Sequence, residues 1–493
     1  MSGSVYYCGR PVAELSGRES AAAIGYVMQN PEQQIVTDKV WHELAFGLEN
    51  LGTPRDVIAR RIAETASWLG IGELYDRSAA ELSGGQKQLV NLAAVLVMQP
   101  ELLILDEPTA QLDPIAASGF MNAVGRLNRE HGMTILMVEH RLEEAVPMCS
   151  RLMVMDGGRL IYSGEPGSVI RQLGSRPEIM CGMPAAARLS AVLGSDTDNA
   201  PVPLTVREGR ELVGRYRNDV KKLPDNGYSY QIPDTPALEM KDVYFRYSRS
   251  SPDVLRGVGL SVGVGEIFCI LGGNGSGKTT TLMAAAGLIK PYSGVIRVFG
   301  RKLKEYKNQS LYRNCLAMLP QDVQTVFLRN TVREELDDAG IKPEELPFDL
   351  TGLLDMHPYD LSGGEQQLAA LAKVLAQKPG ILLLDEPTKG LDAAAKLRIS
   401  GVIRDLKKSG MTVIAVTHDV EFAAGLADRC ALFFAGEAVF SGTPHEFFPE
   451  NSFYTTAAVR ITRGQFTGAV TVDEAAELCR INGLKAAGNG GGA

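Results

Sequence analysis

The sequence predicts an α/β fold in which two similar domains follow one another, each built around a parallel sheet with helices on its faces. Three observations predict it: a long internal repeat, an alternation of strand-like and helical segments in each copy, and a glycine-rich loop between an apolar run and a helix. A long repeat indicates duplicated units. Alternating strands and helices are typical of a parallel sheet covered by helices.

The repeat is clearest in one stretch of each copy. Residues 81–113 read ELSGGQKQLVNLAAVLVMQPELLILDEPTAQLD, and residues 360–392 read DLSGGEQQLAALAKVLAQKPGILLLDEPTKGLD, an offset of 279. Further matches join MTILMVEH with MTVIAVTH and YVMQNPEQ with AMLPQDVQ. The paired residues are Gln29 with Gln321, Glu107 with Glu386, and His140 with His418. The first copy has 13 more residues between its glutamine and its LSGG.

Short apolar runs recur at matching places in both copies. They are ELLILD and MTILMV in the first copy, and GILLLD and MTVIAV in the second. Their length favours strands over helices, and their continuous apolar character predicts burial on both faces of a sheet.

Residues 271–280, LGGNGSGKTT, fit the phosphate-binding pattern G-x-x-x-x-G-K-[ST]. The run from Glu266 to Leu271 reads as a buried strand, and a helical segment begins at Lys278. Glycines at such a turn let backbone N–H groups face an anion at a helix N-terminus. The lysine then reaches the β- and γ-phosphates, and the Thr279 hydroxyl can bind Mg²⁺. The predicted nucleotide-binding residues here are Gly272, Gly273, Asn274, Gly275, Ser276, Gly277, Lys278, Thr279 and Thr280.

Length and composition exclude several classes of protein. A chain of 493 residues predicts two to four domains. It has no run of about 18 apolar residues and no leader-like start, so we expect it to be neither membrane-spanning nor secreted. The net charge of −8 argues against a surface that binds nucleic acid by neutralising phosphates. Seven scattered cysteines favour a reduced cytosolic setting, with Cys269 packed in the core.

We expect four segments along the chain. They are a first domain over residues 1–171, a partly helical linker over 172–236, a second domain over 237–446 and a C-terminal tail over 447–493. Clusters of Pro, Gly and charged residues indicate the linker. The last residues, GNGGGA, are predicted to be disordered.

The order of phosphate loop, glutamine, LSGG, LLLDEP and late histidine resembles the ATPase subunits of ABC transporters over nearly the whole chain. More narrowly, NPEQQIVTDKVWHELAFGLENLG, DLSGGEQQLAALAKVLAQKP, DEPTKGLDA and FYTTAAVR resemble the fused double ATPases of energy-coupling factor (ECF) transporters. Those transporters import vitamins or transition-metal ions. The resemblance implies two tandem ABC-type P-loop domains, each with a helical subdomain beside its sheet.

The resemblance also implies catalytic roles in the second copy. Asp385 should orient the Mg²⁺ shell, and Glu386 should polarise the attacking water. A solvated loop is the alternative for a strand-end Asp-Glu pair, but the same pair follows the same apolar run in the first copy. His418 should contact the γ-phosphate, and Gln321 should sense Mg²⁺ and water while its loop touches a membrane partner.

The resemblance also suggests roles for one tyrosine and two aspartates. Tyr247 resembles the aromatic residue that stacks on adenine, and strand packing is the alternative for it. Asp392 and Asp113 match the loop through which the two halves of such ATPases contact each other.

The resemblance implies that each LSGG serves the opposite domain, where its amides close over a γ-phosphate. The signature residues expected to complete the site on Lys278 are Ser83, Gly84, Gly85 and Gln86. The residues expected in the second half-site are Gln29, Glu107, His140, Ser362, Gly363 and Gly364.

The first copy departs from the pattern because it has no phosphate loop. The opening SGSVYYCGRPV aligns with SGVIRVFGRKL at Ser293, so about 55 residues that the second copy has before this point are not in the sequence. We therefore expect an N-terminally truncated first domain, one complete composite ATP site and half of another.

The leading functional hypothesis is an ATP-hydrolysing subunit of an ECF-type importer, with ATP and Mg²⁺ as cofactors. Its expected partners are an integral membrane T-component and a substrate-binding membrane component, which implies a peripheral place on the cytoplasmic face of the membrane. The alternative is a soluble tandem ABC ATPase that acts on ribosomes or nucleic acid, and a third is a regulatory ATPase without turnover. The sequence does not specify the transported solute.

Overall fold

The computed structural model describes residues 3–194, 201–223, 235–307 and 310–484, which fall into two compact units, Met1–Met148 and Cys149–Ala493. The hairpin of β6 (Leu152–Asp156) and β7 (Arg159–Gly164) belongs to the second unit, although the sequence prediction includes it in the first domain. No helix in the described ranges is long and apolar enough to cross a membrane. The predicted disordered end, residues 488–493, lies outside the described residues.

A six-stranded sheet forms the centre of the second unit, in the order β13-β14-β15-β10-β16-β17. The strands are β13 (Leu316–Leu319), β14 (Ile381–Asp385), β15 (Thr412–Val416), β10 (Ile267–Leu271), β16 (Arg429–Phe434) and β17 (Glu437–Gly442). All neighbours pair in parallel except β16 and β17. Every residue of β10, β14 and β15 is buried, including Cys269, which confirms the prediction of buried strands and explains their continuous apolar runs.

A second, antiparallel sheet has the order β12-β11-β8-β9. Its strands are β8 (Leu238–Phe245), β9 (Leu255–Val262), β11 (Ser293–Val298) and β12 (Arg301–Lys302). Its inner side chains share one apolar core with Phe268 and Ile270 of β10 and with Leu282 of helix α12 (Lys278–Ala285). The helix that follows the phosphate loop is therefore packed into the domain core and cannot move independently of the sheet.

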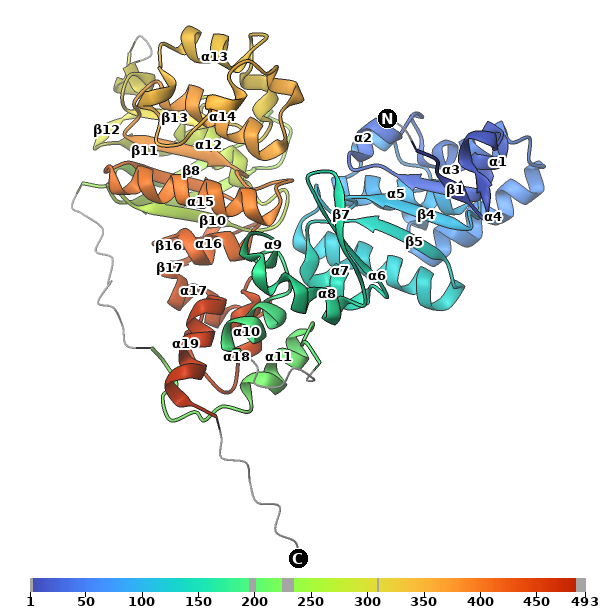
Figure 1. Cartoon of the computed structure of the whole chain (residues 1–493). Helices are drawn as coiled ribbons and strands as arrows, with labels where there is room; N and C mark the ends of the chain where they lie inside the picture. Colours follow the sequence, from blue (N-terminus) through green and yellow to red (C-terminus); the bar gives the residue numbers. More distant parts are fainter. Residues whose placement is uncertain (1–2, 195–200, 224–234, 308–309, 485–493) are drawn as a thin grey trace, which may run out of the picture. The chain divides into compact units, whose positions relative to one another are not determined.

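Helices of the second unit cover the six-stranded sheet and form a helical subdomain, which appears as the yellow and orange helices α13 and α14 in Figure 1. The helices are α13 (Val332–Ala339), α14 (Gly363–Leu375), α15 (Ala393–Lys408) and α16 (Val420–Leu426). Their apolar faces join one core with β10, β14 and β15. The predicted α/β class, with a parallel-sheet core and a helical subdomain, is confirmed.

The first unit repeats part of this plan. Its strands β3 (Ile24–Val27), β4 (Leu102–Asp106) and β5 (Thr134–Val138) form a parallel sheet in that order. Its main helices are α3 (Val40–Asn50), α4 (Arg55–Leu69), α5 (Gly84–Leu96) and α6 (Pro114–His131). The shorter elements before them are β1 (Tyr6–Tyr7), β2 (Arg10–Pro11), α1 (Gly17–Ala23) and α2 (Pro31–Gln34).

Strand β5 differs from its counterpart β15 in its surroundings. Within the described ranges β5 pairs only with β4, whereas β15 lies between β14 and β10. Its burial alternates along the strand, and Leu136 and Val138 are 41% and 51% exposed. The prediction of burial on both faces is therefore wrong for β5, because one face of the first sheet presents apolar side chains, in contrast to the doubly covered sheet of the second unit.

The segments predicted as linker and tail pack together. Helices α10 (Ala185–Leu193), α11 (Val206–Val213), α18 (Ala457–Thr462) and α19 (Val472–Asn482) share one apolar core, which we call the helical cluster. They are the green and red helices that lie together in Figure 1. The remaining helices of these segments are α8 (Pro166–Gln172), α9 (Pro177–Met180) and α17 (Pro444–Glu450). The cluster therefore joins chain segments that lie about 270 residues apart.

The two halves of the helical cluster are related in sequence. Residues 205–213, TVREGRELV, and residues 471–479, TVDEAAELC, share five of nine residues, and both helices begin with a Thr–Glu capping box. Each helix of one half packs against a helix of the other half, α10 against α19 and α11 against α18. Asn482, the last residue of α19, binds the chain that follows α11, since its side-chain amide donates to the Val220 carbonyl and accepts from the Val220 N–H, both at 2.8 Å.

We predict that Gly209→Val destabilises the helical cluster. A Cβ at Gly209 would lie 2.9 Å from Ile461 Cγ1 and 3.1 Å from Ala186 Cβ, so the larger side chain forces the helices apart at a cost of about 1–3 kcal/mol. Denaturant unfolding followed by circular dichroism measures this loss. Gly401→Val in α15, where no atom lies within 4 Å of the added Cβ, is the control. Equal stability of the two variants would contradict the prediction.

Candidate functional site

The phosphate loop connects the central strand β10 to α12, as predicted, and two of its glycines are required by geometry. A Cβ at Gly272 would lie 2.4 Å from the Phe433 carbonyl oxygen of β16. Gly277, the N-cap of α12, has φ 101°, which side chains rarely adopt. The loop can therefore press against the sheet and turn its backbone toward the helix N-terminus, where an anion is stabilised.

Lys278 and Ser276 fit a bound phosphate. Lys278 is buried, and its Nζ donates to the carbonyls of Gly272 at 2.9 Å and Gly273 at 3.0 Å, so it spans the loop. The Ser276 hydroxyl is buried with no hydrogen-bond partner among the described residues. An unsatisfied buried hydroxyl is costly, and a phosphate oxygen in the loop would satisfy it.

Thr279 and Asp385 provide oxygens that suit Mg²⁺. Thr279 Oγ1 donates to Asp385 Oδ1 at 3.0 Å, and burial raises the pKa of Asp385 to about 6. Hydroxyl and carboxylate oxygens with remaining phosphate and water ligands are the usual Mg²⁺ set. Gln321 follows β13, whose Leu319 is in register with Leu384, so its exposed side chain lies at the same sheet edge.

Glu386, which is buried, pairs with His418, whose side chain is 12% exposed. His418 Nδ1 lies 2.8 Å from Glu386 Oε2, and the His418 backbone N–H also donates to that oxygen at 3.3 Å. Burial works to raise the pKa of Glu386, but the hydrogen bond and charge of His418, with the charge of Lys278, outweigh it and hold the pKa below its usual value. Glu386 has φ 52° and donates its backbone N–H to Val416 O at 2.8 Å, which turns the side chain toward the histidine.

The first unit brings together the same three residue types. Glu107 accepts from Gln29 Nε2 at 2.5 Å, and His140 Nε2 lies 2.9 Å from its other carboxylate oxygen. Glu107 also has a positive φ, 43°. The Tyr26 hydroxyl donates to Asp106 Oδ2 at 2.8 Å, as Thr279 does to Asp385 in the second unit.

Both signature serines occupy helix N-caps. Ser83 caps α5 in a capping box with Gln86, and Ser362 caps α14 in one with Glu365. Both serines are exposed, as are Gly84 and Gly363, whereas Gly85 and Gly364 pack against the alanine one turn into α6 and α15. An exposed helix N-terminus favours an anionic ligand. That each LSGG segment completes the ATP site of the opposite domain stays a prediction.

Tyr247 is largely exposed, and the aspartates Asp113 and Asp392 are helix N-caps. Tyr247 is 65% exposed, its ring meets Phe245 edge-on, and its hydroxyl lies 3.3 Å from Thr280 Oγ1. A ring face near the phosphate loop therefore stays open to a stacking partner. Asp113 and Asp392 cap α6 and α15 by accepting backbone N–H groups of those helices.

Sequence reasoning missed the buried glutamates that hold the loops after the two site glutamines. Glu43 accepts from the backbone N–H groups of Val36 and Thr37, at 3.1 and 2.9 Å. Glu335 does the same for Leu328 and Arg329, at the matching positions of the repeat. The signal was available, because both glutamates keep the offset of 292 that relates the glutamines.

The two units differ in how these loops are fastened. Lys373 of α14 pairs with the buried Glu335 and donates to the Val326 carbonyl. The first unit has Ala94 at that position of the repeat and instead uses Gln88 and Asn91 of α5. These two side chains are fully buried and donate to the carbonyls of Met28 and Pro31, at 3.2 and 3.1 Å.

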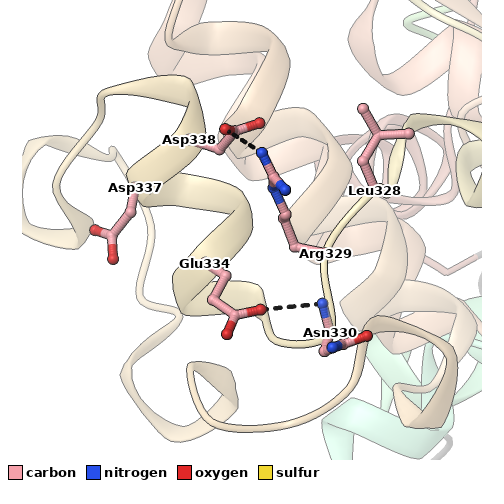
Figure 2. A pocket seen from close by; sticks show the side chains of 6 residues that line it. All are labelled: Leu328, Arg329, Asn330, Glu334, Asp337 and Asp338. Atoms are coloured by element: carbon pink, nitrogen blue, oxygen red, sulfur yellow. Dashed lines mark hydrogen bonds and ion pairs between the residues drawn. The ribbon is translucent and has the colours of Figure 1, made fainter.

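A surface hollow of about 470 Å³ opens beside the loop of the second unit. Figure 2 shows its lining, in which Arg329 pairs with Asp338 at 2.7 Å and the Asn330 N–H donates to Glu334 at 3.1 Å. The six lining residues are Leu328, Arg329, Asn330, Glu334, Asp337 and Asp338. With three carboxylates and one guanidinium, the hollow favours a basic ligand.

We predict that Lys278→Ala weakens ATP binding by about 10- to 100-fold, because the phosphates lose a charge-assisted hydrogen-bond donor fixed inside the loop. Equilibrium titration with a fluorescent ATP analogue measures the change in Kd. Lys408→Ala, an exposed lysine at the end of α15, is the matched control. Undiminished affinity in Lys278→Ala would overturn the assignment of the loop.

Comparison with curated proteins gives matches over nearly the full chain. The chain is 40% identical over 491 residues to a "Putative ABC transporter ATP-binding protein" of Bacillus thuringiensis subsp. konkukian, covering 97% of this chain and 88% of that protein. A protein of the same name from Streptomyces avermitilis is 35% identical, with 96% and 88% covered. One from Clostridium tetani is 32% identical, with 89% and 99% covered.

Comparison with solved structures shows the fold. A chain in the crystal structure of the complex of archaeal ribosomal stalk protein aP1 and ribosome recycling factor aABCE1 matches with a TM-score of 0.56, at 23% identity, covering 86% of this chain and 75% of that chain. The pattern of the ABC transporter family matches residues 1–110 and 255–389. These ranges include both LSGG segments, at 82–85 and 361–364. The chain therefore belongs to the family of ABC transporter ATP-binding proteins, with two tandem ATPase regions, and is an ATPase.

Proposed function

We propose that this chain is the energy-coupling ATPase of an ECF-type importer for a vitamin or a transition-metal ion. The stretches NPEQQIVTDKVWHELAFGLENLG and FYTTAAVR support the ECF type. The relatives with ABC transporter names support a role in transport. The expected partners are a membrane T-component and a substrate-binding membrane component, which would hold the chain at the cytoplasmic face.

The observation that carries the transport proposal is the pair of loops that follow the site glutamines. Each loop ends in an exposed apolar side chain, Val36 at 64% and Leu328 at 75% exposure. Each is held by a buried glutamate, Glu43 or Glu335. An exposed apolar tip on a firmly held loop suits docking of a short cytoplasmic helix. The acidic hollow beside Leu328 suits basic residues on that helix.

The proposed hydrolysis at the second unit uses Glu386 and His418. Glu386 accepts a proton from the attacking water, and the hydrogen bond from His418 keeps it ionised and oriented for that role. Thr279, Asp385 and Gln321 would hold Mg²⁺, which neutralises charge on the phosphates. Lys278 and the loop amides bind the β- and γ-phosphates, and Ser83 with its neighbouring glycines would complete the site.

The first unit has a different proposed role. It contributes the signature Ser83 to the complete site, while Gln29, Glu107 and His140 with Ser362 form the second half-site. The phosphate loop in this sequence, with Lys278, belongs to the complete site.

We predict that Glu386→Gln retains ATP binding and lowers turnover by about 10²- to 10⁴-fold, because an amide cannot take the proton of the attacking water. Phosphate release and filter binding of radiolabelled ATP measure the two properties separately. Glu344→Gln, an exposed change in the helical subdomain, should behave as wild type. Unchanged turnover in Glu386→Gln would exclude it as the catalytic carboxylate.

We predict that the chain captures an integral membrane protein from solubilised membranes, and that Leu328→Asp lowers the capture about tenfold or more, because a charge replaces an apolar contact at the loop tip. Val439→Asp is the matched control, since it is 52% exposed on β17, at the opposite edge of the sheet from β13. Mass spectrometry of the captured proteins provides the measurement. Recovery of ribosomes without any membrane protein would favour the soluble alternative instead.

A further inference from the structure

The segment that leads into the helical cluster begins beside the phosphate loop. A Cβ placed on Gly273 would lie 3.3 Å from the hydroxyl oxygen of Tyr454, a closer approach than an ordinary contact. Gly273 has no positive φ, so the tyrosine, and not the backbone, is what disfavours a side chain there. Lys278 donates to the carbonyl of this same glycine, so Tyr454 lies beside a residue that holds the lysine in place.

The same segment is also tied to the helix that follows the site histidine. The backbone N–H of Ala457 donates to Glu421 Oε1 at 2.8 Å, and Glu421 lies in the first turn of α16, three residues after His418. Residues 454–457 therefore contact two parts of the ATP site, the phosphate loop and the helix that begins beside His418.

The segment is rigid enough to transmit a displacement. Thr455 is fully buried and donates its hydroxyl to the Phe448 carbonyl at 2.6 Å, and Phe448 is fully buried as well. Thr456, also fully buried, caps α18 by accepting from the Val459 N–H at 3.1 Å. Tightly packed, hydrogen-bonded side chains transmit movement because they cannot absorb it by local rearrangement.

Helix α18 connects this segment to helices that follow the first ATPase region. Arg210 of α11 donates to the Arg460 carbonyl of α18 at 2.7 Å, and Ile461 packs on Gly209 of α11. Arg480 of α19 makes the equivalent bond to the Val192 carbonyl of α10 at 2.9 Å. A shift of α18 therefore acts directly on the chain that follows the first ATPase region.

We propose that Tyr454 is a positioning residue for the phosphate loop, and that residues 454–457 transmit the nucleotide state of the loop to the helical cluster. Nucleotide in the loop sets the place of Gly273, and the Tyr454 hydroxyl follows it. The displacement passes through the capped start of α18 to α10 and α11. The proposal rests on the ATP site of the second unit and is independent of which solute, if any, is transported.

Hydrogen exchange on the full chain tests the relay, with and without the non-hydrolysable analogue AMP-PNP and Mg²⁺. In wild type we expect slower exchange in the phosphate loop and altered exchange in α10 and α18. Tyr454→Phe at saturating analogue should keep the loop protection and lose at least half of the change in α10 and α18. Tyr306→Phe is the control, because that hydroxyl bonds the Val298 carbonyl away from the site.

The outcomes separate the relay from the ATP site. A protected loop with no change in α10 and α18 of wild type overturns the relay and leaves the ATP site intact. A full response in Tyr454→Phe also overturns it. An unprotected loop in wild type overturns the ATP site and the relay together. Loss of the response in Tyr454→Phe with a normal response in Tyr306→Phe supports the proposal.

A double-substitution cycle tests the contact itself. Gly273→Ala should raise the KM for ATP about two- to tenfold, because the methyl group displaces the tyrosine or the loop. Tyr454→Phe removes the crowded oxygen, so the double variant should have a lower KM than Gly273→Ala alone. Strictly additive effects would show that the two residues do not act on each other, which contradicts the positioning role.

Discussion

The arrangement of the second unit depends on the parallel pairing of β10 between β15 and β16. The carboxyl ends of these strands and of β14 lie at one edge of the sheet, so the residues that follow them are brought together. Thr279 follows β10, Asp385 and Glu386 lie at the end of β14, and His418 follows β15. The hydrogen bonds between these side chains are consequences of strand order.

Burial then determines the chemistry of that edge. The same desolvation acts on two neighbouring carboxyl groups with opposite results, because their partners differ. Asp385 has a neutral hydroxyl as its hydrogen-bond donor, and burial raises its pKa to about 6. Glu386 is next to His418 and near Lys278, and these groups keep its pKa below the usual value despite burial. Asp385 is therefore suited to binding a cation, while the ionised form of Glu386 is favoured.

Comparison of the two units shows which features are local. Both Glu107 and Glu386 have positive φ, both donate a backbone N–H to the last residue of the strand that precedes the histidine, and both contact that histidine. The first unit keeps this geometry without a phosphate loop, so the carboxylate–histidine pair is formed by two adjacent parallel strands alone. The two units differ in how far their sheets are buried. Leu136 and Val138 of β5 are exposed, whereas every residue of β15 is buried.

The sequence by itself determined the elements whose signal is local. Apolar runs predicted β10, β14 and β15, the glycine pattern predicted the loop before α12, and the repeat matched Glu107 with Glu386 and His140 with His418. The contact of each glutamate with its histidine came from the tertiary structure. Only the tertiary structure showed that the segments predicted as linker and tail pack into one helical cluster. Their short helices have ambiguous local patterns, and their burial exists only where α10 and α11 meet α18 and α19, far away in the chain. The position of Tyr454 beside Gly273 belongs to the same class, because a contact across 181 residues follows from packing and leaves no periodic trace in the sequence.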